Sequence, residues 1–262
     1  MPEVEITLTL LGLMFAAGLA AGWIDAVVGG GGLVQLPALL LGMPQAAPVQ
    51  VLATNKIASI AGTSVAAATY YRRVRPDLRT ALPLAAAAFL GSLGGAQVAA
   101  LIPKDAFTPI IVVALLVVGA YTLFKPDLGS VQVLRFQGRG HLGVAMLAGV
   151  LIGAYDGALG PGTGSFLVFA LVGLLGYDFL QASAKAKMAN WATNAAALCL
   201  FVPMGAVVWK VGLAMAAGNL VGGYLGARTA VARGGGFVRL VFVLVVGGFL
   251  LRLGGEMVLD LL

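Results

Sequence analysis

Charged residues, histidine and cysteine are all scarce in this chain of 262 residues. Only 10% of the residues are charged and 60% are hydrophobic, which is far from the composition of a soluble domain. The single cysteine, Cys199, excludes an internal disulfide, and a Cys-based metal site is not expected. The single histidine, His141, follows two arginines at the head of a predicted helix, where we interpret it as a loop or interface residue.

Motifs of catalysis and of nucleotide binding are missing as well. The chain has no nucleophile–base constellation, no His-rich metal spacing and no P-loop with a GKS or GKT ending. Gly29–Gly32 is not a nucleotide fingerprint, because no βαβ pattern surrounds it. We therefore expect no catalytic residue, no metal and no cofactor, and we expect that the protein is not an enzyme.

Long apolar runs dominate what is present. Runs of about twenty residues, the length that crosses a bilayer as a helix, alternate with short polar stretches. This pattern predicts an all-α polytopic membrane protein. The net charge of +6 is spread over short loops without a basic stripe, so no nucleic-acid partner is expected. Residues 1–10 carry two glutamates and no basic segment, so we expect the first apolar segment to be retained rather than cleaved. Full-length membrane helices are expected near 49–71, 80–101, 107–124, 183–203, 210–230 and 238–253.

A glycine-broken apolar segment occurs twice. In the first copy Asp25 lies four residues before Gly29–Gly32, and in the second Asp156 lies four residues before Gly160-Pro-Gly-Thr-Gly164. Hydrocarbon cannot hydrogen-bond a broken backbone, so such breaks persist only where protein or water satisfies them. Matching breaks in the two halves of a chain indicate the binding site of a transporter.

The breaks belong to two repeats joined by a polar linker. Each repeat is expected to contain a broken, re-entrant helical hairpin, near 5–41 or 142–176, and three transmembrane helices. The basic loops around Arg72–Arg79 and Arg228–Arg239 follow different helices of their repeats. The positive-inside rule then gives the two repeats opposite orientations, which makes them inverted repeats. The expected boundaries are 1–125 for the N-terminal repeat, 126–140 for the linker and 141–262 for the C-terminal repeat.

Polar residues and further glycines match between the repeats. Asn55 matches Asn190, and Ser59 falls opposite Asn194. Within each repeat the two residues are four positions apart, so they share one helix face. The segment Gly91–Gly95 matches 218–222. Side-chain amides on one face suit a path for an oxyanion, and interhelical hydrogen bonding is the alternative.

The helix after each break offers unpaired N–H groups and the positive end of its dipole, which favour an anion. The alternative is close helix packing through small residues. The residues predicted to bind the substrate are Gly29, Gly30, Gly31, Gly32, Asn55, Lys56, Gly160, Gly162, Thr163, Gly164, Ser165, Asn190 and Asn194.

Two carboxylates and two lysines accompany these residues. Asp25 and Asp156 lie inside apolar helices, where they either couple transport to protons or cap the free N–H groups of the neighbouring break. Lys56 and Lys187 flank the amide clusters, where they either supply positive charge to the site or extend to the membrane interface.

The stretch from residue 22 to residue 55 resembles the TauE/SafE sulfite exporter family. The hallmarks are Asp25, the glycine run, Pro37, Gly42-Met-Pro44 and Ala53-Thr-Asn55. The second half, from residue 156 to residue 194, looks like the second copy of the pattern, so the resemblance covers essentially the whole chain. It implies a permease or exporter of small sulfur-containing anions, such as sulfite or organosulfonates, in the cytoplasmic (inner) membrane of a prokaryote.

These observations lead to one hypothesis. The protein is a secondary transporter, and specifically an exporter, of a small sulfur-containing anion, and it works by alternating access around a midplane site at the two breaks. Its expected partners are the anion and the lipid bilayer, with the monomer and the homodimer left open. The alternatives are an anion channel and a non-transporting membrane scaffold for an enzyme complex.

Overall fold

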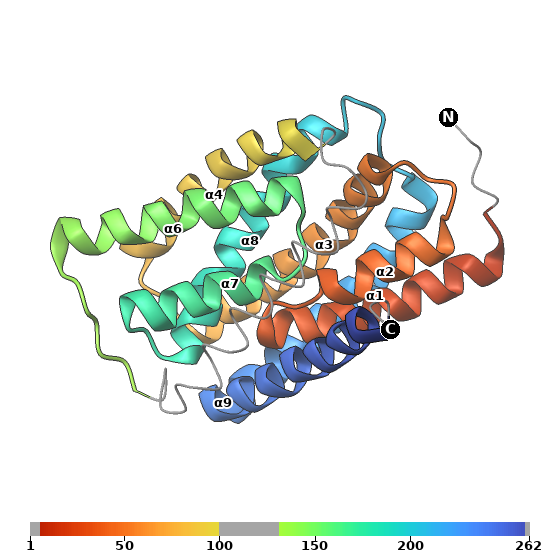
Figure 1. Ribbon diagram of the computed structural model, residues 1–262. Helices are drawn as coiled ribbons and strands as arrows, with labels where there is room; N and C mark the ends of the chain where they lie inside the picture. Colours follow the sequence, from red (N-terminus) through yellow and green to blue (C-terminus); the bar gives the residue numbers. More distant parts are fainter. Residues whose placement is uncertain (1–5, 100–130, 260–262) are drawn as a thin grey trace.

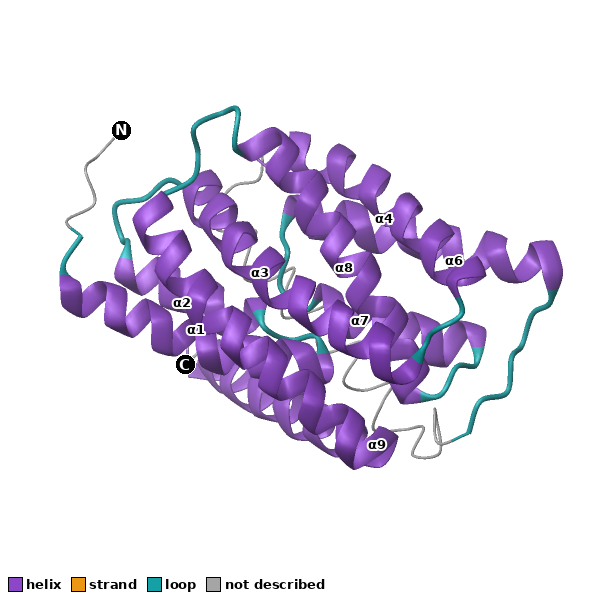
Figure 2. Cartoon of the chain, turned by 180° about the vertical axis from the view of Figure 1, so that it is seen from behind, coloured by secondary structure: helices purple, strands orange, loops and turns teal. Residues whose placement is uncertain are grey.

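The computed structural model describes residues 6–99 and 131–259, and in these ranges all regular structure is helical (Figure 1, Figure 2). This agrees with the expected all-α class. The expected helix at 107–124 and residues 126–130 of the polar linker lie outside the described residues. The elements are α1 (Leu8–Val28), α2 (Gly32–Gly42), α3 (Pro48–Val74), α4 (Leu78–Val98), α6 (Gly138–Ala158), α7 (Thr163–Phe169), the π-helix η2 (Ala170–Leu175), α8 (Phe179–Phe201) and α9 (Trp209–Leu259).

Three described helices, α1, α4 and α6, are long and apolar enough to cross a membrane. Two shorter apolar helical stretches, 32–42 and 163–175, follow the two breaks. Polar caps define where several helices begin. Asp178, for example, accepts hydrogen bonds from the backbone N–H groups of Leu180 and Gln181 at 2.9 Å each, which starts α8.

Both broken segments fold back as helical hairpins. The chain turns at Gly29, whose φ is +83°, and α2 then runs back along α1. At the far end of α2, a methyl group added to Gly42 would lie 2.8 Å from Cε of Met14 in α1. In the second half, the N–H of Val133, which precedes α6, donates to the carbonyl of Gly176 after η2 at 2.8 Å. Both segments therefore follow the path of a helical hairpin, whereas their re-entry into a membrane stays a prediction.

The region around Arg228–Arg239 differs from its prediction as a loop. The loop is reduced to one residue, because α9 consists of two helices that meet in a kink at Gly234, where φ is +76° and ψ is −176°. Arginine has a good helix propensity, so the local charge does not stop the helix, and only the glycine conformation bends it. The two helices expected at 210–230 and 238–253 are the two arms of this bent element.

The first helix of each half packs along the last described helix of the other half. Figure 1 shows α1 beside α9 and α4 beside α6. Glycines allow this approach, since a methyl group on Gly222 would lie 2.0 Å from the carbonyl oxygen of Leu19, and one on Gly91 would lie 2.2 Å from that of Val150. Small residues at such interfaces let helix backbones come into direct contact.

The same contacts recur 131 positions apart. The contact of Gly222 with Leu19 corresponds to that of Gly91 with Val150. The starts of α7, α8 and α9 also follow those of α2, α3 and α4 by 131 positions, at 163 after 32, 179 after 48 and 209 after 78. The sequence match of Gly91–Gly95 to 218–222 is therefore displaced by one helical turn. Small residues recur every four positions on both helices, so neighbouring registers look alike in sequence.

Candidate functional site

The two glycine breaks meet each other. The N–H of Ser165 donates to the carbonyl of Gly29 at 3.2 Å, and its hydroxyl donates to the carbonyl of Val28 at 2.7 Å. A methyl group added to Gly29 would lie 2.1 Å from the carbonyl carbon of Gly164, and one added to Gly164 would lie 2.5 Å from Cα of Gly29. Only glycine fits at these two positions, because the backbones themselves are in contact.

Two buried ion pairs cross between the halves beside the breaks. Lys56 Nζ lies 2.6 Å from Asp156 Oδ2, and Lys187 Nζ lies 2.9 Å from Asp25 Oδ2. Lys187 also donates to the backbone carbonyl of Asp25. The two lysines are 1% and 0% exposed, so the alternative that they extend to the membrane interface is wrong.

The pairs obey the same 131-position spacing as the helix contacts. Lys56 and Lys187 are 131 positions apart, and so are Asp25 and Asp156. By this spacing Lys187 is the counterpart of Lys56, and Asn190 is the counterpart of Ser59 rather than of Asn55. The sequence match of Asn55 to Asn190 is therefore also displaced by one helical turn from the 131-position spacing.

Side chains and backbone groups of the protein satisfy the broken chain. Asp25 Oδ1 accepts a hydrogen bond from the N–H of Gly31 at 3.3 Å, so its expected capping role is present in the structure. In the second break, the hydroxyl of Tyr155 donates to the carbonyl of Pro161 at 2.7 Å. Thr163 Oγ1 donates to the carbonyl of Gly160 at 2.9 Å. These contacts hold both breaks open as turns inside the bundle.

A small polar cavity lies where these groups converge. Its volume is about 10 Å³, close to the minimum for one water molecule. Asn55 Oδ1 is buried without a hydrogen-bond partner in the described part of the chain, so this acceptor can still take a hydrogen bond from a donor such as water. The lining residues are Asp25, Gly29, Gly32, Asn55, Lys56, Ser59, Asp156, Gly160, Gly162, Thr163, Gly164, Asn190 and Asn194.

Most of the residues predicted from the sequence therefore come together, although their role in binding stays a prediction. Gly30, Gly31 and Ser165 are not among the lining residues and contribute to the turns and to the contact between them. Ser59 lines the cavity, and its hydroxyl bonds Gln35 Oε1 at 2.9 Å. Lys187 was missing from the predicted substrate-binding set, and the 131-position spacing from Lys56 would have identified it.

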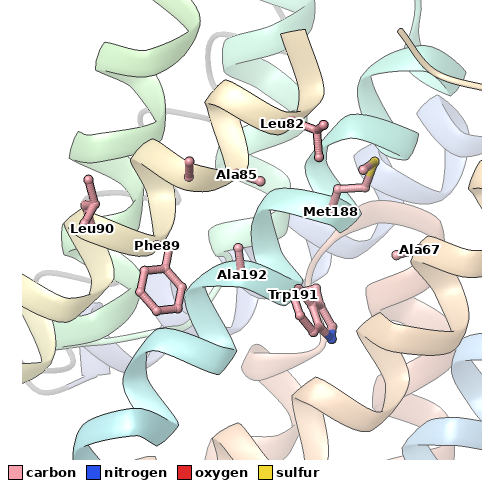
Figure 3. A pocket seen from close by; sticks show the side chains of 9 residues that line it. Ala67, Leu82, Ala85, Phe89, Leu90, Met188, Trp191 and Ala192 are labelled. Carbon is pink, nitrogen blue, oxygen red and sulfur yellow. The ribbon is translucent and has the colours of Figure 1, made fainter. Parts of the chain in front are cut away.

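A larger groove on the other side of α8 is apolar (Figure 3). Its volume is about 690 Å³, and it lies between α3, α4 and α8. Trp191, at its edge, donates its indole N–H to Ser64 at 2.9 Å and so joins α8 to α3. Without polar partners this groove does not suit an oxyanion, which leaves the polar cavity as the candidate site. The lining residues are Ala67, Leu82, Ala85, Ala86, Phe89, Leu90, Met188, Trp191 and Ala192.

The histidine lies away from the cavity. His141 Nε2 is 2.8 Å from the hydroxyl of Tyr177, which in turn lies 3.2 Å from Thr80 Oγ1. These contacts join the starts of α4 and α6 to the loop before α8. His141 is therefore an interface residue, as expected.

Comparison with known proteins agrees with this architecture. The family model described as "Sulfite exporter TauE/SafE" matches residues 14–253. The chain is 37% identical over 255 residues to a "Probable membrane transporter protein ORF9" of Sinorhizobium sp., covering 95% of this chain and 94% of that protein.

Two further relatives have similar names. A "Probable membrane transporter protein" of Haemophilus influenzae is 37% identical over 243 residues, with 92% and 93% of the two chains covered. The "Probable membrane transporter protein YfcA" of Escherichia coli is 35% identical over 237 residues, with 90% and 86% covered. No solved structure matches the chain. With its apolar helices and these relatives, the chain belongs to the TauE/SafE sulfite exporter family and is a probable multi-pass membrane transporter.

Proposed function

We propose that this protein is a secondary transporter of a small sulfur-containing anion, such as sulfite or an organosulfonate, in the inner membrane of a prokaryote. The observation that carries the proposal is the meeting of two glycine breaks at a polar cavity flanked by two cross-half ion pairs. Broken helices that contact each other inside a bundle are the arrangement that transporters use for a substrate site.

The chemistry of the cavity favours an oxyanion. Backbone turns, the amides of Asn55 and Asn190 and the ammonium of Lys56 surround it. Sulfite and sulfonate oxygens accept several hydrogen bonds, and those from charged donors are the strongest. A membrane potential of 100 mV contributes about 2.3 kcal/mol to the outward movement of one negative charge. This contribution acts only if the anion moves without a compensating proton or cation.

The reciprocal packing supports inverted repeats that exchange access between the two sides. Each half contributes one lysine and one aspartate to the cross-half pairs, and each first helix packs on the last described helix of the other half. In this mechanism the halves rock against each other around the cavity, so the contact between Gly29 and Gly164 must open on one side at a time. The cavity of about 10 Å³ corresponds to an occluded state, because a sulfonate group needs more room than one water molecule.

Flux measurements on the purified full-length chain in proteoliposomes test the proposal. We expect saturable uptake of labelled sulfite or methanesulfonate, and we expect either anion inside the vesicles to accelerate uptake of the other by exchange. Acetate and sulfate serve as comparison anions. Non-saturable flux without exchange would support the anion channel. The absence of flux for every sulfur anion tested would refute the transporter and support the scaffold.

Variants at the breaks connect the flux to the site. Gly162→Leu places a side chain where φ is +77° beside the cavity, so transport should be lost while membrane insertion remains. Gly31→Leu should do the same, because its added Cβ would lie 2.6 Å from Cβ of Asp25. Gly94→Leu is the matched control, since nothing lies within 4 Å of a Cβ at that position. Full transport by the first two variants would remove the breaks from the site.

A further inference from the structure

The positive charge in the candidate site is already balanced. Lys56 is paired with Asp156, and Lys187 is paired with Asp25, so the four groups carry no net formal charge. An anion that enters alone would place a negative charge beside two carboxylates that already hold the ammonium groups. In a buried site such an uncompensated charge is strongly unfavourable.

We propose that the anion binds together with one proton, which neutralises Asp25 and releases Lys187 to pair with the anion. The inference rests on the proposed function and specifies how that transport is driven. In the step, a hydronium ion in the adjoining water breaks one of its O–H bonds and leaves as water, while its proton forms an O–H bond at Asp25 Oδ2. The contact of Lys187 with that oxygen is exchanged for a contact with the anion, and no other bond changes. The loaded site is again neutral, so transport is electroneutral anion–proton symport.

The two carboxylates differ in their access to a proton. Asp25 is 14% exposed, whereas Asp156 is 2% exposed and lies against Lys56 at 2.6 Å. Protonation at Oδ2 of Asp25 also leaves the turn intact, because the other oxygen, Oδ1, accepts from the N–H of Gly31. In this conformation Asp25 is therefore the group that takes the proton.

In the described ranges, no other carboxylate lies near the two ion pairs to take up the proton. Tyr70 of α3 faces the end of α1, where its hydroxyl donates to the carbonyl of Ala26 at 2.9 Å. Tyr155 precedes Asp156 and donates to Pro161. Both tyrosines donate their hydroxyl protons to backbone carbonyls. Among the described residues, the charged ones that line the cavity are Asp25, Lys56 and Asp156, and Lys187 adjoins it through its ion pair with Asp25.

Methanesulfonate is a suitable probe because its own charge stays constant from acidic to alkaline pH. The full chain is reconstituted in vesicles that contain a pH-sensitive dye, and potassium with valinomycin sets the membrane potential. We expect each methanesulfonate that enters to acidify the lumen, at a rate that does not change with the imposed potential. The rate should fall as the external pH rises, since the proton is a co-substrate.

Removing one carboxylate should uncouple the proton. In Asp25→Asn, Lys187 has no carboxylate partner, so methanesulfonate should bind without a proton, the lumen should not acidify, and flux should follow the potential. Asp156→Asn should behave alike through Lys56, and the dye and potential measurements on the unmodified chain still test the coupling if either variant fails to fold. Asp178→Asn, which keeps a helix-capping side chain outside the site, should retain the proton-to-anion ratio of the unmodified chain.

The outcomes separate the two proposals. Potential-driven methanesulfonate flux without acidification in the unmodified chain would overturn the symport and leave the transporter standing. Absence of flux for all sulfur anions would overturn the transporter itself. Labelling with dicyclohexylcarbodiimide, which reacts with protonated carboxyls, should modify Asp25. Modification of Asp156 alone would overturn the assignment to Asp25.

Discussion

Breaking the most deeply buried ion pair should destabilise the protein strongly. Lys56→Met removes the ammonium and keeps a side chain of similar length, which leaves the carboxylate of Asp156 buried at 2% exposure with no cation at 2.6 Å. Removing one partner of such a pair typically costs about 3–5 kcal/mol, mostly because the remaining charge stays buried without compensation. We expect a loss of this size in the free energy of unfolding.

The symmetry-related change should cost less. In Lys187→Met the remaining carboxylate of Asp25 is 14% exposed and still accepts the hydrogen bond from Gly31. A loss of about 1–3 kcal/mol, the range for leaving a buried polar group unsatisfied, is expected. The difference between the two variants therefore measures how far the greater exposure of Asp25 and its hydrogen bond from Gly31 stabilise a carboxylate that has lost its lysine.

A double-mutant cycle in detergent micelles provides the assay. Lys56→Met, Asp156→Asn and the double variant are unfolded by titration with a denaturing detergent, and the transitions are followed by tryptophan fluorescence. We expect the double variant to be more stable than Lys56→Met alone, because no uncompensated charge remains in it. A Lys56→Met protein as stable as the unmodified chain, or a double variant no better than the single one, would refute the reasoning.

Three further predictions concern the breaks, the helix contacts and the topology. Gly164→Ala should abolish transport and lower stability by about 1–3 kcal/mol, because its added methyl would lie 2.5 Å from Cα of Gly29; wild-type flux and stability would contradict this. Gly222→Ala should lower the detergent midpoint, and Gly143→Ala, which meets nothing within 4 Å, should not; equal midpoints would exclude the close helix contact. Single cysteines at 72–79 and at 203–210, introduced in a Cys199→Ala background, test the topology of two loops that follow equivalent helices of the two repeats. Inverted repeats predict that the two loops are labelled from opposite sides of the membrane. Labelling of both loops from the same side would exclude inverted repeats.

The sequence alone was enough to predict the class of the protein and to point to the place of its candidate site. Composition and apolar runs indicated membrane helices, because a bilayer selects for length and hydrophobicity in each segment separately. The glycine breaks after Asp25 and Asp156 were also visible, since a broken backbone in an apolar run is unusual wherever the rest of the chain lies. The hairpins observed at both breaks follow from these local features.

The register of the repeats could not be fixed from local patterns. Small residues recur every four positions, so Gly91 matches either of two glycines one turn apart, and only packing against the partner helix selects Gly222. The same ambiguity concealed the equivalence of Lys56 and Lys187. The bend of α9 at Gly234 likewise replaced an expected loop, because the arginines around it are compatible with a helix.

The partners of the buried charges depended on the tertiary structure alone. Lys187 and Asp25 are 162 positions apart in the chain, and Lys56 and Asp156 are 100 positions apart. A lysine near a helix start extends to the interface or folds inward according to what lies beside it, and a sequence window does not contain that neighbour. The sequence thus determined that charge, amides and bare backbone exist in apolar helices, whereas the crossing of the two halves decided that they meet around one neutral cavity.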